Sequence, residues 1–75
     1  MMKGNPAMIT TETYMVEGMT CEHCVRAVTS EILLLPGVQQ VNVDLESGAV
    51  TVTSDNPLDR SSVAEAVDEA GYALA

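Results

Sequence analysis

The sequence has few aromatic side chains. It contains no Trp and no Phe, and its two tyrosines are Tyr14 and Tyr72. The core of a fold built from these 75 residues must therefore consist of Val, Ile, Leu, Ala and Met. That supply suffices for one small two-layer domain, and it leaves no room for a deep substrate cleft. We therefore expect a binding protein and not an enzyme.

Positive charge is also scarce. Three basic residues, Lys3, Arg26 and Arg60, stand against 11 acidic ones, which gives a formal net charge of −8. Nucleic-acid binding requires a basic footprint, so we expect no nucleic-acid partner. Anionic membrane surfaces are disfavoured for the same reason. An acidic surface suits solubility and encounter with a basic protein face.

Long hydrophobic runs are absent as well. No apolar stretch approaches the roughly 20 residues that a membrane span needs, so we expect no membrane insertion. The N-terminus has one Lys and no apolar stretch of the signal-peptide kind. These features favour a cytoplasmic location, where two nearby cysteines usually remain thiols.

Alternation and helical periodicity predict six elements. Met1 to Thr10 show no periodicity and are expected to form a flexible arm, with Met8 a candidate native start; the domain is then residues 11–75. Strands are predicted at Thr11–Glu17, Val38–Leu45, Ala49–Thr53 and Tyr72–Leu74, and helices at Cys24–Leu35 and Arg60–Ala70.

Each predicted helix carries one apolar stripe. The stripe of the first helix comprises Val25, Val28, Ile32 and Leu35. Leu33 and Leu34 lie off this stripe, so we expect them to be partly exposed. The stripe of the second helix comprises Val63, Ala66, Val67 and Ala70. Asp59 is the expected N-cap of that helix, and Gly71 occupies the position after its end where a positive φ is favoured.

The resulting order is βαββαβ. This order predicts an α+β fold of the ferredoxin-like type, with a four-stranded antiparallel sheet and two helices on one of its faces. The Glu46-Ser47-Gly48 turn supports a hairpin between the second and third strands.

Both cysteines of the chain lie in the stretch from Gly18 to Cys24, whose sequence is GMTCEHC. Cys21 falls in a loop and Cys24 in the first turn of the predicted helix. The free N–H groups and dipole of that turn favour a thiolate. Two thiolates separated by two residues select soft metals over magnesium or calcium. A cytosolic Cys-x-x-Cys pair also suits redox chemistry, so both interpretations stand at this point.

The number of available ligands separates the candidate metals. Structural zinc needs four protein ligands and catalytic zinc usually three. The stretch offers two Cys and His23, and His23 is expected to point to solvent once the helix begins. A two-sulfur site fits Cu(I) in near-linear geometry better than it fits zinc.

The same residues resemble a known family. Gly18-Met19-Thr20-Cys21-x-x-Cys24 is similar to the GMTCxxC motif of heavy-metal-associated domains, which occur as bacterial copper chaperones and at the N-termini of copper-transporting P-type ATPases. The similarity covers Thr11 to Leu74 and includes Pro36-Gly37-Val38 and Gly71-Tyr72. The Cys-x-His-Cys form most resembles the CopZ-type chaperones.

This resemblance implies roles for individual residues. Cys21 and Cys24 would be the Cu(I) ligands. Met19 would be an apolar prop under the loop, Gly18 would allow the tight loop, and Tyr72 would approach the site. His23 would mark the chaperone subfamily. The expected supporting residues are thus Gly18, Met19, Thr20, His23 and Tyr72.

The resemblance also implies a function. A chaperone of this kind would pass Cu(I) by thiolate exchange to the metal-binding domain of a P-type copper ATPase, or to a copper-responsive regulator. It would be monomeric without metal, and an open two-sulfur site could form a copper-bridged dimer. The alternatives are an N-terminal metal-binding domain of such an ATPase, a thiol-disulfide redox protein and a mercury-binding scavenger.

Overall fold

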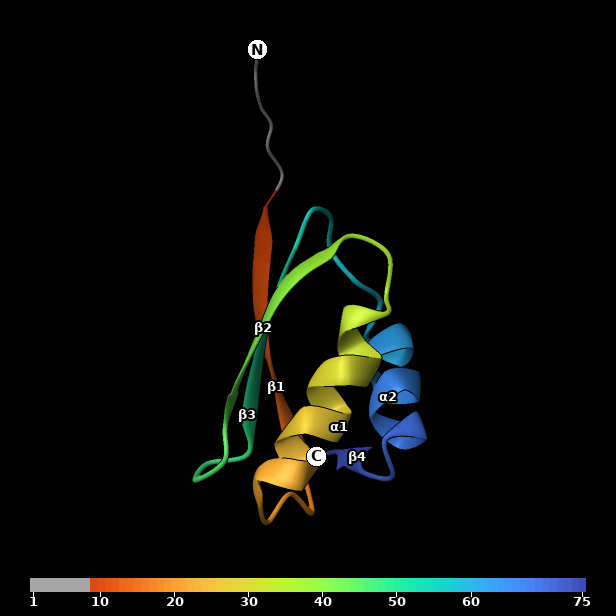
Figure 1. Ribbon diagram of the computed structural model, residues 1–75. Coiled ribbons are helices and arrows are strands. Elements are labelled where there is room, and N and C mark those ends of the chain that lie inside the picture. Colours follow the sequence, from red (N-terminus) through yellow and green to blue (C-terminus); the bar gives the residue numbers. More distant parts are fainter. Residues whose placement is uncertain (1–8) are drawn as a thin grey trace.

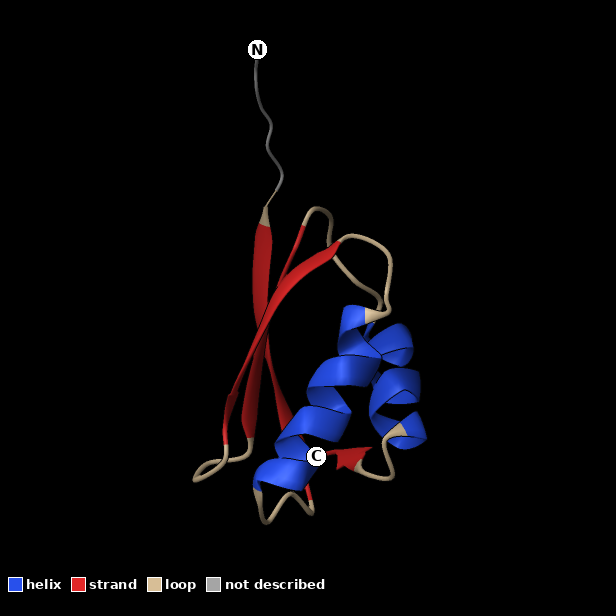
Figure 2. Ribbon diagram, in the orientation of Figure 1, coloured by secondary structure: helices blue, strands red, loops and turns tan. Residues whose placement is uncertain are grey.

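The computed structural model describes residues 9–75, which form two layers. One layer is a sheet, and both helices lie against the same face of it (Figures 1 and 2). The elements in chain order are β1 (Thr10–Glu17), α1 (Glu22–Leu33), β2 (Val38–Asp44), β3 (Ala49–Ser54), α2 (Arg60–Glu69) and β4 (Ala73–Leu74).

The sheet has the strand order β2-β3-β1-β4, and all its neighbouring strands are antiparallel. The two central strands, β3 and β1, are thus not neighbours in sequence. This topology confirms the predicted ferredoxin-like βαββαβ fold with both helices on one face. Within residues 9–75, neither helix is long and apolar enough to cross a lipid bilayer.

The core lies between the sheet and the helices and contains one aromatic ring, that of Tyr14. Its buried members are Tyr14, Val16, Val28, Ile32, Val50, Val52, Val63, Ala66 and Val67. The alternation of β3 directs every second side chain into this layer, and the second half of β1 does the same with Tyr14 and Val16. Valine fills most positions, as expected for a chain without Phe or Trp.

Helix α1 begins and ends two residues earlier than the predicted Cys24–Leu35. Cys21 has extended backbone angles and is the N-cap, since its carbonyl accepts from the N–H groups of Cys24 and Val25. The shift also corrects the apolar stripe. Its buried residues are Cys24, Val28 and Ile32, while Val25 is half-buried. Residues spaced by four positions lie on the same helix face. The first buried side chain of α1 is therefore that of Cys24 and not that of Val25.

Helix α2 ends at Glu69 and not at Ala70. Asp59 occupies the N-cap position as expected, but its side chain makes no capping hydrogen bond. Gly71 has φ +94°, which confirms the predicted positive φ. The N–H of Gly71 donates to the Asp68 carbonyl, and that of Tyr72 donates to the Val67 carbonyl. This pair of bonds is a Schellman motif, which reverses the chain at a defined angle.

The strand ends differ slightly from the prediction. Strand β1 already begins at Thr10, so the domain extends into the expected arm of residues 1–10. The rest of that arm, including the candidate start at Met8, lies outside the described residues except for Ile9. Strand β4 begins at Ala73, because the Schellman turn includes Tyr72.

The hairpin of β2 and β3 has two features that periodicity does not indicate. Strand β2 ends at Asp44, one residue early, and its register with β3 shifts between Val38 and Gln40. Strand β3 continues to Ser54, which is buried. The Ser54 hydroxyl donates to the Asn56 carbonyl at 2.6 Å, so this buried polar group has a partner.

Candidate metal centre

The two cysteines face each other at the start of α1. Cys21 is exposed at the N-cap, and Cys24, two residues inside the helix, is only 6% exposed. Both are free thiols, and their sulfur atoms are 3.8 Å apart. The structure thus brings together the two predicted ligands, with one sulfur open to solvent and the other enclosed.

Hydrogen-bond donors from Thr20 and Tyr72 surround the sulfur of Cys24. The Thr20 backbone N–H lies 3.5 Å from it and the Thr20 hydroxyl 3.9 Å. The Tyr72 hydroxyl donates to it at 2.8 Å. These donors, with the Thr20 N–H first, then the Tyr72 hydroxyl and then the Cys21 backbone, lower the pKa of the Cys24 thiol from 9.0 to about 6. Burial acts against this change but is the weaker effect.

Tyr72 reaches the site because of the turn after α2. The Schellman motif turns the chain back toward the cysteine loop immediately after Gly71. The ring of Tyr72 then lies against Gly18, where an added Cβ would stand 3.4 Å from its Cδ1 atom. Gly18 also has φ +91°. Glycine at this position thus permits the tight loop, because its positive φ is one that other residues rarely adopt.

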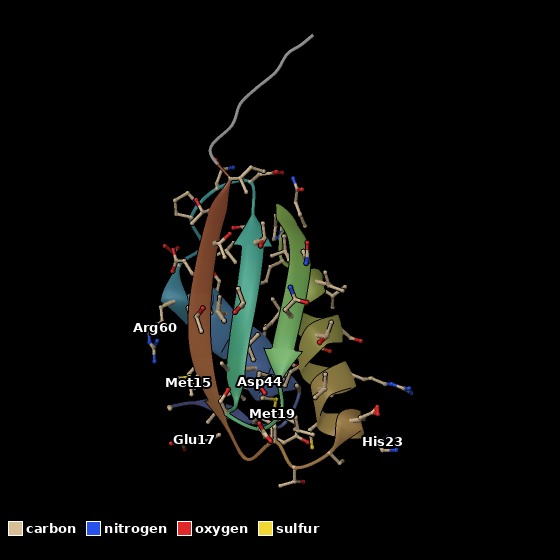
Figure 3. The ribbon with its side chains drawn as sticks, turned by 90° about the vertical axis from the view of Figure 1, so that its left-hand side faces the viewer. Met15, Glu17, Met19, His23, Asp44 and Arg60 are labelled. Atoms are coloured by element: carbon tan, nitrogen blue, oxygen red, sulfur yellow. The ribbon has the colours of Figure 1, made fainter. Side chains whose placement is uncertain are left out.

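The remaining predicted residues lie against the core or on the surface. Met19 is half-buried and packs against the core. His23 and Glu22 are exposed on the first turn of α1. Figure 3 shows His23 pointing outward from the helix, away from the sheet. Among residues 9–75, no three Cys, His, Asp or Glu side chains come together as a metal-binding group.

Two hydrogen bonds to the Cys24 sulfur, from the Tyr72 hydroxyl and from the Thr20 N–H, are not predicted from the sequence. The sequence predicts only that Tyr72 approaches the site. The Gly71-Tyr72 pair after an apolar stripe indicates a helix stop, but the target of the ring depends on how α2 packs. The Thr20 contact depends on the loop conformation that Gly18 permits.

Known proteins are similar in sequence to this chain over most of its length. The family model described as "Heavy-metal-associated domain" matches residues 13–73. The chain is 42% identical over 65 residues to the copper chaperone CopZ of Bacillus subtilis, covering 85% of this chain and 94% of that protein. It is 41% identical over 71 residues to copper-transporting ATPase 2 of Rhizobium meliloti, covering 95% of this chain but 8% of the ATPase.

A solved structure of a CopZ metallochaperone superposes with a TM-score of 0.82 at 36% identity. The match covers 88% of this chain and all of that one. The range of the family match, residues 13–73, includes the Cys-x-x-Cys loop. From the family match over residues 13–73 and from these relatives, we conclude that the chain belongs to the heavy-metal-associated domain family.

Proposed function

We propose that this protein binds one Cu(I) ion between the sulfurs of Cys21 and Cys24 and carries it to another protein. One observation carries the proposal. Two free sulfurs lie 3.8 Å apart, with no third potential ligand of the Cys, His, Asp or Glu type grouped with them in residues 9–75. Soft thiolates alone suit a soft monovalent ion, whereas zinc requires a larger ligand set.

The sulfur separation is compatible with a two-coordinate ion after a small movement. With metal–sulfur bonds near the ~2.3 Å of zinc thiolates, two opposed sulfurs would be about 4.6 Å apart. The loop would therefore open by less than about 1 Å. Cys21 is the exposed partner and precedes the helix, whereas Cys24 is fixed within α1, so the opening falls on Cys21.

The same asymmetry supports release by ligand exchange. Cys21 lies at the surface, where one thiolate of a partner can bind the ion and replace the Cys21 sulfur. A second partner thiolate would then replace the buried Cys24, whose free thiolate is stabilised by the donors around its sulfur. We propose that the receiving site is the metal-binding domain of a P-type copper ATPase or a copper-responsive regulator. The resemblance to an ATPase segment supports the first of these partners.

The likeness to CopZ chaperones supports the remaining features of this function. We propose a cytoplasmic binding protein without catalytic activity, since the chain matches a CopZ chaperone over most of its length. The predicted roles of Gly18, Met19, Thr20 and Tyr72 in supporting the loop belong to this proposal. His23 has no ligand role in it.

Competition for Cu(I) tests the ligands. The reduced protein should take one Cu(I) per chain from a strong chromophoric chelator, and a Cys21→Ser, Cys24→Ser variant should take none. His23→Ala should retain the wild-type affinity. If the double variant competes as well as the wild type, the cysteines are not the ligands. A large loss of Cu(I) affinity in His23→Ala would show that the imidazole is a ligand, contrary to the proposal.

A second assay distinguishes a redox function from Cu(I) transport. A disulfide would require the sulfurs to approach from 3.8 Å to about 2.05 Å. We expect slow reduction of insulin disulfides by the reduced protein. Rapid turnover together with failure to compete for Cu(I) would replace the chaperone proposal by an oxidoreductase.

The second candidate function is a metal-binding domain within a larger ATPase. The 41% identity over 71 residues to an ATPase segment favours it specifically. The mass of the native polypeptide, detected in cell extracts with an antibody to this domain, decides between the two. A product near 7.9 kDa supports the free chaperone, and a far larger one supports the ATPase domain.

The oligomeric state of the copper-loaded protein is measured separately. We expect a monomer without metal and propose that the exposed Cys21 sulfur also permits a copper-bridged dimer. Light scattering of the metal-free and Cu(I)-loaded protein measures this. A loaded species of monomer mass at every concentration would contradict the bridged dimer.

A further inference from the structure

A shallow groove lies between the helices, and it includes the end of α1 opposite the cysteine loop. Figure 1 shows this separation, with the loop at one end of α1 and the start of α2 beside the other end. The groove has a volume of about 190 Å³. It is lined by three apolar residues, three glutamates and one serine, which are Leu34, Leu35, Ala66, Glu31, Glu65, Glu69 and Ser62.

Leu34 is the most exposed large apolar residue among residues 9–75, with 76% of its surface accessible. It is the C-cap of α1, and its N–H donates to the Glu31 carbonyl, while that of Leu35 donates to the Ile32 carbonyl. The helix end therefore fixes its backbone while the side chain faces water. Leu33 beside it is 47% exposed. Covering this surface would remove apolar area from water, which is favourable.

The charged residues that line the groove are all acidic. Three glutamates line it, and among residues 9–75 no Lys or Arg belongs to its lining. Arg60, at the start of α2, donates instead to the Ala75 carbonyl. Carboxylates beside apolar side chains attract a cationic surface and repel an anionic one.

We infer that this groove is a docking site for a cationic amphipathic segment of a partner protein. An apolar side chain of that segment would lie against Leu34, and its Lys or Arg side chains would face Glu65 and Glu69. A second copy of this chain fits poorly, because two facing grooves would bring six carboxylates together. An anionic membrane is repelled for the same reason.

The position of the groove leaves the metal loop free. Leu34 follows Cys24 by ten positions along α1, and a helix rises about 1.5 Å per residue, so the two lie about 15 Å apart. A partner segment can therefore hold this protein without covering the cysteines. Docking at the groove is a function beyond metal binding and does not depend on it.

The test uses the reduced, metal-free protein and a capped synthetic helical peptide of Leu and Lys with one apolar face. We expect the largest amide NMR shifts at Glu31, Leu34, Leu35, Glu65, Ala66 and Glu69. A Glu65→Lys, Glu69→Lys variant should bind about fivefold or more weakly. A Glu12→Lys, Glu46→Lys variant carries the same charge change away from the groove. It should bind within about twofold of the wild type, because salt screens charges beyond a Debye length.

The apolar contact has its own matched pair. Leu34→Ser should weaken binding by about fivefold or more, whereas Met15→Ser, at another exposed apolar residue, should not. Each variant is first shown by circular dichroism to be folded. The Cys21→Ser, Cys24→Ser variant should bind the peptide normally, which keeps this result independent of the copper proposal.

Several outcomes would overturn the inference. The shifts could map to the sheet face or the cysteine loop, or both charge variants could weaken binding equally. The groove amides could shift with protein concentration alone, which would make a second copy the occupant. Binding to phosphatidylserine vesicles with loss in Leu34→Ser would make a membrane the occupant.

Discussion

Cys24 combines two properties that usually exclude each other. Its side chain is 6% exposed, yet its thiol has a pKa of about 6. Burial alone would favour the neutral thiol. The Thr20 N–H and the Tyr72 hydroxyl replace water as donors to the sulfur, so a thiolate is stable inside the domain. The proposed ligand Cys24 is thus a thiolate at neutral pH without any bound metal.

Removal of the Tyr72 hydroxyl should raise the pKa of Cys24. In a Cys21→Ser background, which isolates one sulfur, we expect Tyr72→Phe to raise that pKa by about one pH unit, because a donor to the thiolate is lost. Thiolate absorbance in the ultraviolet, followed against pH, measures the change. Tyr14→Phe is the control, since the Tyr14 hydroxyl donates to Glu12 and not to a sulfur. Equal titration curves for the two variants would show that the Tyr72 hydroxyl does not stabilise the thiolate.

At the scale of elements, the two helix ends at the site define its geometry. The N-terminus of α1 holds the cysteines, and the Schellman turn after α2 places Tyr72 beside them. Antiparallel packing of α1 and α2 brings the helix ends together, although Tyr72 and Cys24 are 48 residues apart in sequence. A residue distant in sequence therefore sets the chemistry of the loop.

Gly71, in the turn after α2, should contribute to stability only through its positive φ and not through close contacts. Gly71 has φ +94°, and an added Cβ would meet no atom within 4 Å, so Gly71→Ala should cost about 1–2 kcal/mol of unfolding free energy. Gly48 has φ +80°, and an added Cβ would stand 2.8 Å from the Val16 carbonyl oxygen. Gly48→Ala should therefore cost more than Gly71→Ala. Urea denaturation measures both, and equal costs would contradict the steric argument.

Helix α1 offers a matched test of burial. Ile32 is fully buried and Leu34 is 76% exposed. Replacing either by Val removes one methylene. We expect Ile32→Val to cost about 0.5–1.5 kcal/mol of unfolding free energy and Leu34→Val less than about 0.5 kcal/mol. Urea denaturation of the two variants checks this, and a larger cost for Leu34→Val would mean that its side chain contributes to the core.

Much of the element pattern follows from the sequence, because alternation and helical spacing report local burial. They predict the βαββαβ order, the exposure of Leu33 and Leu34 and the positive φ of Gly71. The predicted start of α1 is wrong by two residues, because Cys21 caps the helix through its backbone and not with an oxygen-bearing side chain. The bond from Tyr72 to Cys24 depends on packing across the fold, which periodicity does not report.

At the scale of the whole molecule, the thiolate links folding to pH. The pKa of Cys24 is lowered from 9.0 to about 6 in the folded state, so the unfolded chain binds a proton more readily between these values. Unfolding then takes up a proton, and stability rises with pH across this window. The contribution is complete above about pH 9 and is lost as pH falls through about 6.

Denaturation against pH tests this link. The urea midpoint of the reduced, metal-free protein should rise from pH 6 to pH 9, and that of Cys24→Ser should change much less. Every other titratable group is common to both proteins, so the difference between them isolates the thiol. Parallel curves for both would show that the folded and unfolded pKa values of Cys24 are the same.

The contact between Tyr72 and Cys24 also orders events during synthesis. During translation the cysteine loop leaves the ribosome first. Tyr72 follows Cys24 by 48 residues and therefore leaves it later. Until then the sulfur lacks this donor, and an incomplete chain keeps a thiol closer to its ordinary protonation. Protonated thiols are poor metal ligands and poor targets for oxidants. The pKa of Cys24 is therefore fully lowered only after the last turn of the fold has formed.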